Sequence, residues 1–300
     1  MHVLSFVLLS LVAANESLGP GEHTRSLTLA DQKRTFYVHV PAKYDAKTPT
    51  PLVIVLHGAM TDGKMTEIYT GMDKKADEAG FIAVYPNGTG YGSLLTWNCG
   101  GLGDWGKSKP DDVAFLGKML DDLEKVLNVN PKRVYATGIS NGGMMCYKLA
   151  AEMSDRIAAI APVAGTMTFD KFQLKRPVSV IHFHGTDDPL VPFGGPEANK
   201  PQFFAFRPVE DTIRAMATAN ECPKVPTITD EPHKATEPTK TKRTTYRPSK
   251  DGAEVVLITI EGGGHTWPGA KFNVEVLGKT THDFTANDLM WEFFEKHEMK

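Results

Sequence analysis

Short, continuous apolar runs alternate along the chain with segments in which apolar residues recur every three or four positions. The continuous runs are rich in Val, Ile, Ala and Phe; they are Pro51–Gly58, Phe81–Gly88, Val134–Ser140, Ile157–Gly165, Pro177–Gly185 and Ala253–Gly264. Such runs are typical of strands buried on both faces of a parallel sheet.

The periodic segments predict helices that cover this sheet. They are residues 66–79, 113–127 with Asp111 and Asp112 as candidate caps, the tail after Ser140, 209–220 and 287–297. An alternating hairpin, Ser26–Pro41, precedes the first buried strand. We predict an α/β fold: a single mostly parallel sheet flanked by helices, with an N-terminal antiparallel hairpin, in one domain over residues 21–300. The segment rich in Pro, Thr and Lys, 223–244, is expected to be an exposed excursion from that domain.

The first residues of the chain differ from the rest. Val3–Ala14 is apolar and ends in small residues before Asn15, although the preceding residues include no Lys or Arg. This pattern is typical of a secretory signal. We therefore expect residues 1–20 to be a signal peptide and N-terminal tail, and the protein to be secreted or periplasmic.

Composition and charge narrow the classes of partner. The net charge is −3, and no run of five like charges occurs, so neither nucleic acid nor an anionic membrane is an expected partner. No stretch reaches the roughly 18 apolar residues of a membrane-spanning helix. We expect a monomer that acts on a small or polymeric substrate.

Three cysteines cannot all pair within the chain. Cys146 falls in a predicted helix and is expected to be a buried thiol. Cys99 and Cys222 lie in loop-like sequence, where one bridge between them is allowed. No CxxC pair indicates a metal site.

Gly138-Ile139-Ser140-Asn141-Gly142 stands between a predicted buried strand and a predicted helix. It fits the G-x-S-x-G pattern, in which a tight turn projects a nucleophilic serine above the sheet. Its glycines leave room for the neighbouring strand and helix. The Asn141 N–H at the helix start can stabilise a developing oxyanion. The alternative is a glycine-rich turn whose serine merely caps the helix.

A serine nucleophile needs a base, and the base needs an orienting carboxylate. His265 follows a predicted strand in a glycine-rich loop and is the candidate base. The acid is expected after the strand that ends at Gly185, where Asp187 and Asp188 are both candidates; the residues alone do not choose between them.

Several motifs together carry a resemblance to a known family. HGA, TGISNGGMM, HGTDDPLVP, GGGHTWPG and the terminal NDLMWEFFEKH resemble the secreted polyhydroxybutyrate-depolymerase-like and feruloyl esterases of the α/β-hydrolase superfamily. The resemblance implies a serine esterase with Ser140 as nucleophile, Asp188 as acid and His265 as base. It also implies Ala59 as the second oxyanion donor, with Met60 as the alternative, and it requires no cofactor or metal.

The resemblance leaves the ester open. Feruloyl or acetyl esters of plant polysaccharide, polyhydroxyalkanoates and synthetic polyesters of the PET type are all candidates. A serine peptidase of related fold and a non-catalytic binding module are rival functions.

Other features allow further interpretations. Trp97 and Trp267, in loops at the catalytic end, are expected to contact substrate; Trp105 and the cluster Phe203–Phe206 are either further contacts or loop packing. His182 and His184 alternate on one strand face and are interpreted as core residues rather than metal ligands. Gly101–Gly106 matches GxGxxG but lacks the strand and helix of a dinucleotide site.

Overall fold

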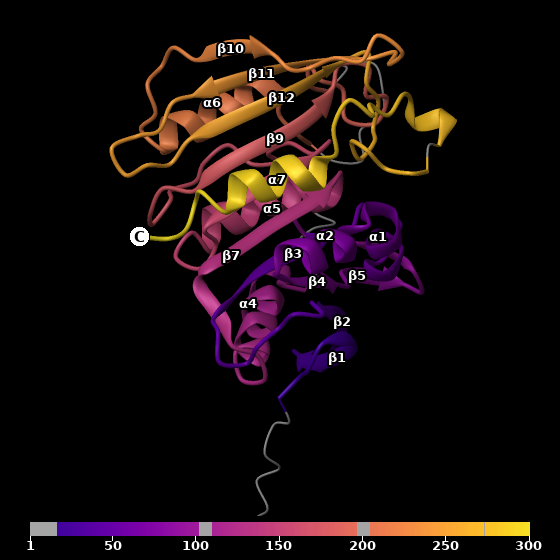
Figure 1. Ribbon diagram of the computed structural model, residues 1–300, viewed down its shortest axis with the longest axis vertical. Helices are drawn as coiled ribbons and strands as arrows, with labels where there is room; N and C mark the ends of the chain where they lie inside the picture. The colour runs from indigo at the N-terminus through magenta and orange to yellow at the C-terminus, as the bar shows by residue number, and fades with distance from the viewer. Residues whose placement is uncertain (1–16, 102–109, 197–204, 273) are drawn as a thin grey trace, which may run out of the picture.

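The computed structural model describes residues 17–101, 110–196, 205–272 and 274–300. Its main feature is a ten-stranded sheet with the strand order β1-β2-β4-β3-β7-β8-β9-β12-β11-β10 (Figure 1). The strands are β1 Gly21–Leu29, β2 Gln32–Val40, β3 Thr50–Leu56, β4 Ile82–Pro86, β7 Val129–Ile139, β8 Ala159–Val163, β9 Ser179–Gly185, β10 Thr227–Asp230, β11 Lys240–Tyr246 and β12 Val255–Glu261. A separate hairpin joins β5 Thr89–Tyr91 to β6 Leu94–Thr96.

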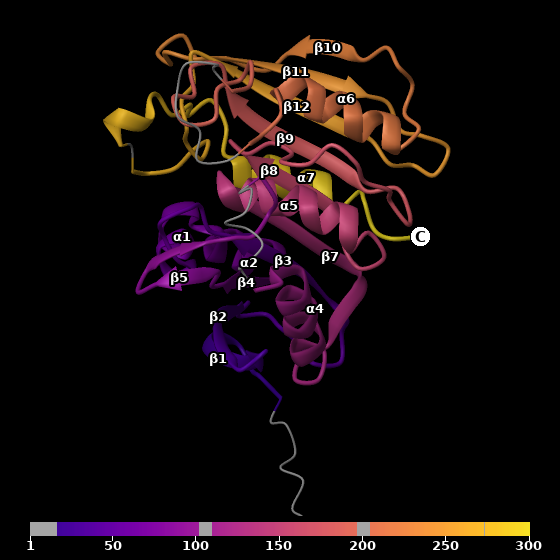
Figure 2. The same ribbon diagram turned by 180° about the vertical axis from the view of Figure 1, so that it is seen from behind.

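The middle of the sheet, from β4 to β12 in the strand order, is parallel, and both ends are antiparallel. The helices are α1 Gly63–Thr70, α2 Met72–Ala79, α4 Asp112–Leu123, α5 Asn141–Glu152, α6 Val209–Ala219 and α7 Ala286–Phe294, with a 3₁₀ turn η1 at Glu275–Leu277. Helices α2 and α7 cover one face, and α4, α5 and α6 cover the other (Figures 1 and 2). The predicted fold class and N-terminal hairpin are confirmed.

Two predicted segments differ from the structure. The single helix expected over residues 66–79 is two helices, because Gly71 adopts a left-handed conformation (φ 59°) that ends α1 and begins α2. The segment 223–244 is mostly exposed, as predicted, but it is part of the sheet, since it contributes β10 and the start of β11 to its edge. These edge strands are polar and Thr-rich, so they lack the apolar run that marks a central strand.

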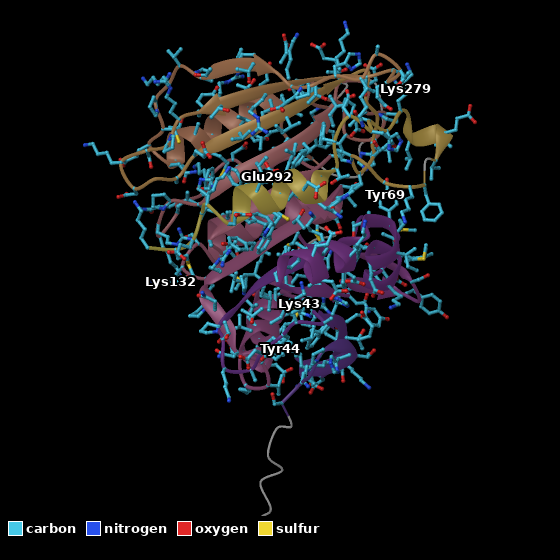
Figure 3. The ribbon with its side chains drawn as sticks, in the orientation of Figure 1. Lys43, Tyr44, Tyr69, Lys132, Lys279 and Glu292 are labelled. Carbon is cyan, nitrogen blue, oxygen red and sulfur yellow. The ribbon has the colours of Figure 1, made fainter. Side chains whose placement is uncertain are left out.

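The parallel strands β3, β7, β9 and β12 all run in the same direction, so their carboxyl ends lie together at one end of the sheet. Figure 3 shows Tyr69 at this end and Lys132, near the start of β7, at the opposite end. Loops at the carboxyl ends of parallel strands are the usual place for a site in such sheets. Within the described ranges, no helix is both long and apolar enough to cross a membrane.

Candidate active site

Ser140 occupies a strained turn between β7 and α5. Its φ and ψ are 58° and −122°, and its side chain makes no capping hydrogen bond to the helix. A Cβ atom added to Gly138 or to Gly142 would lie 2.6 Å or 2.3 Å from the Leu56 carbonyl oxygen of the neighbouring strand. Only glycine fits at both positions. The backbone therefore has the geometry of a nucleophile turn, and the serine does not serve as a helix cap.

Asp188 and His265 form a buried hydrogen-bonded pair. The Nδ1 atom of His265 lies 2.8 Å from Oδ2 of Asp188. The Oδ1 atom of Asp188 accepts hydrogen bonds of 2.8 Å from the N–H groups of Leu190 and Val191. Asp187, in contrast, is exposed and accepts a hydrogen bond from the adjacent Thr186 hydroxyl. Of the two aspartates that the residues left open, Asp188 is the one that the structure brings to His265.

Burial alone would raise the pKa of the Asp188 carboxyl. The hydrogen bond from His265, the charges of His265 and His184, and the Val191 N–H outweigh it, so the pKa of Asp188 lies below its ordinary value. The carboxylate is therefore ionised at neutral pH and accepts the His265 Nδ1–H. This arrangement leaves Nε2 of His265 as the nitrogen available to act as a base.

Ser140 and His265 line the same pocket, whose volume is about 740 Å³. Among the described residues that line it, only His265 and Tyr69 carry ionisable side chains. The lining comprises Gly58, Ala59, Met60, Thr61, Met65, Thr66, Tyr69, Ile139, Ser140, Met144, Pro189, Leu190, Val191, Pro192, Phe206, His265, Val274 and Leu277. Most of these side chains are apolar, so the pocket suits an uncharged group.

Tyr69 is a pocket residue that the sequence did not reveal. Its hydroxyl accepts a hydrogen bond of 3.1 Å from the Trp267 N–H, and burial raises its pKa, which the Trp267 hydrogen bond partly offsets. The helical pattern around Tyr69 marked it only as a position on a helix, and no local motif distinguishes it.

Two backbone N–H groups were predicted to form an oxyanion hole. Among the described residues, neither the Ala59 N–H nor the Asn141 N–H donates to another protein atom. The Met60 N–H, the alternative donor, is already used in a 2.8 Å hydrogen bond to the Leu95 carbonyl oxygen. This contact removes Met60 as a donor and favours Ala59.

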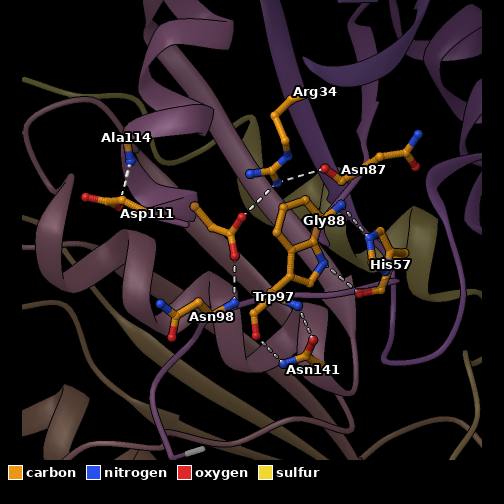
Figure 4. Close-up of polar contacts among 10 residues, drawn as sticks. Arg34, His57, Asn87, Gly88, Trp97, Asn98, Asp111, Ala114 and Asn141 are labelled. Carbon is orange, nitrogen blue, oxygen red and sulfur yellow. Dashed lines mark hydrogen bonds and ion pairs between the residues drawn. The ribbon is translucent and has the colours of Figure 1, made fainter. Parts of the chain in front are cut away.

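The Asn141 side chain, at the start of α5, joins the nucleophile turn to the segment after β6 that contains Trp97 (Figure 4). Its Oδ1 accepts from the Trp97 N–H at 2.6 Å, and its Nδ2 donates to the Trp97 carbonyl oxygen at 3.2 Å. The Trp97 indole N–H donates in turn to the His57 carbonyl oxygen at 2.9 Å. Trp97 thus links Asn141 to His57, two residues before Ala59, and these contacts restrain the backbone near both candidate donors.

Trp97 and Trp267 are not among the residues that line the pocket shared by Ser140 and His265. Both side chains are buried, at 0% and 1% exposure. The Trp267 indole N–H donates to the Asn287 side chain, as the Trp97 indole does to His57. Both indoles are enclosed by protein and have used their only donor, so a direct contact of either side chain with substrate stays a prediction that this arrangement does not favour.

The remaining sequence interpretations have simple outcomes. Cys99, Cys146 and Cys222 are all free and buried, so no Cys99–Cys222 bridge is present. Phe206 lines the pocket. The signal segment through residue 16, Trp105 in the GxGxxG match, Phe203 and Phe204 lie outside the described residues.

One cluster of potential metal ligands occurs in the described part of the chain: Glu22, His39 and Asp73. None of these residues lines the pocket. The two His39 ring nitrogens already contact Glu22 and Asp77.

Known proteins resemble this chain along most of its length. It is 31% identical over 283 residues to "Putative esterase NocK" of Nocardia uniformis subsp. tsuyamanensis, which covers 90% of this chain and 81% of the relative. It is 29% identical to a bifunctional acetylxylan esterase/xylanase of Neocallimastix patriciarum and 28% identical to feruloyl esterase B of Piromyces equi. These matches cover 76% and 77% of this chain but only 31% and 42% of the two fungal proteins.

Residues 74–189 match the prolyl oligopeptidase family. Among solved structures, an acetyl xylan esterase from Aspergillus awamori superposes with a TM-score of 0.60 at 16% identity, covering 91% of this chain and 99% of that one. A thermostable esterase gives a TM-score of 0.58 at 15% identity, covering 93% and 63%. At such low identity these structures support the fold alone.

Proposed function

The chain belongs to the esterase family of the α/β-hydrolases and is a carboxylic ester hydrolase, and from that premise we propose that Ser140, His265 and Asp188 form its catalytic triad. The observation that carries the proposal is the 2.8 Å contact between His265 Nδ1 and Asp188 Oδ2, at a pocket that His265 shares with Ser140. The unused Nε2 of His265 is the base in this scheme.

The first half of the reaction transfers the acyl group to the enzyme. Ser140 Oγ attacks the ester carbonyl carbon while His265 Nε2 takes the hydroxyl proton. The positive charge on the imidazole is balanced by the Asp188 carboxylate. When the tetrahedral intermediate collapses, His265 gives its proton to the departing alkoxy oxygen, and the alcohol leaves. An ester between the acyl group and Ser140 remains.

The second half repeats these steps with water. His265 takes a proton from the water, which attacks the acyl carbon, and then returns a proton to Ser140 Oγ as the acid leaves. In both halves the N–H groups of Ala59 and Asn141 are the proposed donors to the oxyanion. One such donor contributes on the order of 3–4 kcal/mol of transition-state stabilisation.

The proposed substrate is an uncharged ester, since a charged group would be desolvated in an apolar pocket without a partner. Two relatives are named for feruloyl and acetylxylan esters, which favours feruloyl or acetyl esters of plant polysaccharide. Polyhydroxyalkanoate-type polyester is the next candidate, and PET-type polyester is a further one.

A substrate panel tests the proposal: p-nitrophenyl acetate, methyl ferulate, acetylated xylan, polyhydroxybutyrate film and PET film, each with Ser140→Ala as the blank. We expect hydrolysis of at least one soluble ester that the variant lacks. Activity that survives in Ser140→Ala contradicts the proposed nucleophile.

A peptide substrate is the second candidate function, because the prolyl oligopeptidase family matches residues 74–189. A p-nitroanilide peptide assayed beside the esters distinguishes the two. Cleavage of the anilide at a rate comparable to that of the best ester would favour a peptidase.

Export is proposed on the apolar segment Val3–Ala14 alone. Expression of the full chain followed by N-terminal sequencing of the secreted fraction tests it. A new N-terminus near Asn15 is expected, and a chain retained in the cell with Met1 intact contradicts it.

A further inference from the structure

A buried chain of hydrogen bonds runs from α5 to the loop that carries Asp188. The Tyr147 hydroxyl lies 2.9 Å from Nδ1 of His182. Nε2 of His182 lies 3.0 Å from Nδ1 of His184, and Nε2 of His184 lies 2.7 Å from the Val191 carbonyl oxygen. All three side chains are at most 1% exposed. The proposed reaction uses none of them.

This series of hydrogen bonds allows only one consistent arrangement of protons when both histidines are neutral. A carbonyl oxygen can only accept, so His184 Nε2 carries a proton and His184 Nδ1 is an acceptor. His182 must then donate from Nε2 and accept at Nδ1, where the Tyr147 hydroxyl donates. Each hydrogen bond therefore points from α5 toward the Asp188 loop.

The surroundings favour this neutral state. Burial lowers the pKa of His182 well below its ordinary value, and the neighbouring His184 lowers it further. Burial also lowers the pKa of His184; Asp188 and Val191 offset part of this, and the charge of His265 adds to it. Burial, together with Cys146, keeps the pKa of the Tyr147 hydroxyl well above its usual range. All three groups hold their protons in fixed places at neutral pH.

His184, the last side chain in this series of hydrogen bonds, lies next to the proposed acid, Asp188. His184 Nε2 is 3.5 Å from Asp188 Oδ2, the oxygen that accepts from His265. Val191 accepts from His184 through its carbonyl and donates its N–H to Asp188 Oδ1. His184 thus acts on the carboxylate in two ways: its Nε2–H lies close to the negative charge, and it holds Val191, the residue whose own N–H donates to the other carboxylate oxygen.

We propose that Tyr147, His182 and His184 form a proton-ordered chain that positions Asp188 and favours its anionic state, so that His184 is a positioning residue for the reaction. The proposal rests on the proposed triad. The bland alternative is that the two histidines only fill the core between the sheet and α5.

Two substitutions of His184 separate these readings. His184→Phe removes both the acceptor for His182 and the N–H that faces Val191, whereas glutamine keeps an N–H near the position of Nε2 and an amide oxygen that can accept. We expect His184→Phe to lower kcat about 10- to 100-fold with KM within about twofold of wild type, and His184→Gln to stay within about threefold in kcat. A core-filling role would lower kcat in both variants alike, or in neither; either result overturns the proposal, as does a change confined to KM.

The pH profile supplies a readout that packing would not move. The groups that face His184 are His182, Asp188 and His265, with Tyr147 beyond His182. His184 Nε2 lies 3.5 Å from the Asp188 carboxylate, so losing its N–H dipole in His184→Phe leaves the negative charge less balanced and favours protonation of the Asp188–His265 pair. His184→Phe should therefore move the acid limb of kcat/KM to higher pH, and His184→Gln, which keeps an N–H, should not. An unmoved limb in His184→Phe counts against the proposal.

Further measurements keep the test decisive. If His184→Phe does not fold, Tyr147→Phe removes only the first donor and should lower kcat about three- to tenfold at unchanged KM; wild-type kcat overturns the proposal. Long-range ¹⁵N–¹H spectra of labelled histidine should show His182 and His184 as neutral Nε2–H forms from pH 5.5 to 8, and titration of either in that range overturns it. His23→Phe, far from the pocket at β1, is the matched control. Activity lost in Ser140→Ala but not in the His184 variants would support the proposed triad and reject only the positioning role of Tyr147, His182 and His184.

Discussion

On the β3 and β7 side of the pocket, close backbone contacts set the position of Ser140, whereas on the β9 and β12 side, side-chain hydrogen bonds set Asp188 and His265. The first side depends on glycines packed against the Leu56 carbonyl and on a positive φ at Ser140. The second depends on one carboxylate that satisfies His265 and two backbone N–H groups at once.

The difference has consequences for substitution. A side chain added at Gly138 or Gly142 on the nucleophile side must move the main chain and therefore disturbs both geometry and stability. A change on the acid–base side can leave the shape intact and alter only where protons and charge reside. Substitutions that change side-chain size by a similar amount should therefore lower stability and kcat together on the nucleophile side, but mainly kcat on the acid–base side.

The largest expected effect is that of Ser140→Ala. Losing the attacking oxygen should lower kcat by about 10⁶-fold, as removal of a triad serine does elsewhere. The serine side chain makes no cap hydrogen bond, so the unfolding temperature should stay near that of wild type. Steady-state kinetics with p-nitrophenyl acetate and a thermal melt check both points. A residual kcat above about a hundredth of wild type would show that another group is the nucleophile.

The second effect separates the two adjacent aspartates. Asp188→Asn should lower kcat by roughly 10⁴-fold, because an amide favours the wrong His265 tautomer and does not balance the imidazolium charge. Asp187→Asn is the matched control: its side chain is exposed and accepts a hydrogen bond from the adjacent Thr186, so its kcat should fall less than about tenfold. The opposite ranking would identify Asp187 as the acid.

The third effect tests the backbone side. Gly142→Ala places a Cβ 2.3 Å from the Leu56 carbonyl oxygen, so the turn must shift. We expect a destabilisation of about 1–3 kcal/mol and a roughly 10²-fold loss of kcat from misplacement of Ser140. Gly194→Ala has open space around its Cβ and is the control. Wild-type kcat in Gly142→Ala would mean that sterics do not position the serine.

The smallest expected effect concerns stability against pH on the nucleophile side. Burial, only partly offset by its hydrogen bond to Gly58, lowers the pKa of His57 to about 4. Between the unfolded pKa near 6.5 and this value, only the unfolded chain binds the proton, so stability rises with pH. From pH 7 to pH 5 this histidine alone should reduce the unfolding free energy by roughly 2 kcal/mol.

Denaturant unfolding at both pH values measures the difference, which should shrink in His57→Gln and persist in His23→Gln. An equal pH dependence in wild type and His57→Gln would assign the loss to other groups.

The sequence predicted most of the central fold and the nucleophile side. Continuous apolar runs marked the parallel strands, and G-x-S-x-G marked the turn at Ser140, because glycines packed against a neighbouring strand are visible as residue types. The polar edge strands β10 and β11 were missed, since half-exposed edges carry no apolar run. The break at Gly71 was missed because apolar residues at helical spacing, Ile68, Met72 and Ala76, continue across it.

The acid–base side was less accessible from the sequence. Asp187 and Asp188 are identical in chemistry, and only burial and the reach to His265 distinguish them. Tyr69 enters the pocket from a helix distant in the chain, which no local pattern reveals. Trp97 and Trp267 were assigned to substrate from residue type and loop position, whereas their side chains are buried and do not line the pocket of Ser140 and His265. Such relations depend on tertiary packing, which periodicity does not encode.

Covalent labelling with a fluorophosphonate tests the central claim most directly. The reagent phosphonylates a serine only where a base and an oxyanion site activate it. Intact-mass analysis should show one adduct on the wild type, peptide mapping should place it on Ser140, and Ser140→Ala and His265→Ala should show none at matched exposure. An adduct on another serine, such as Ser93, or equal labelling of His265→Ala, would contradict the account.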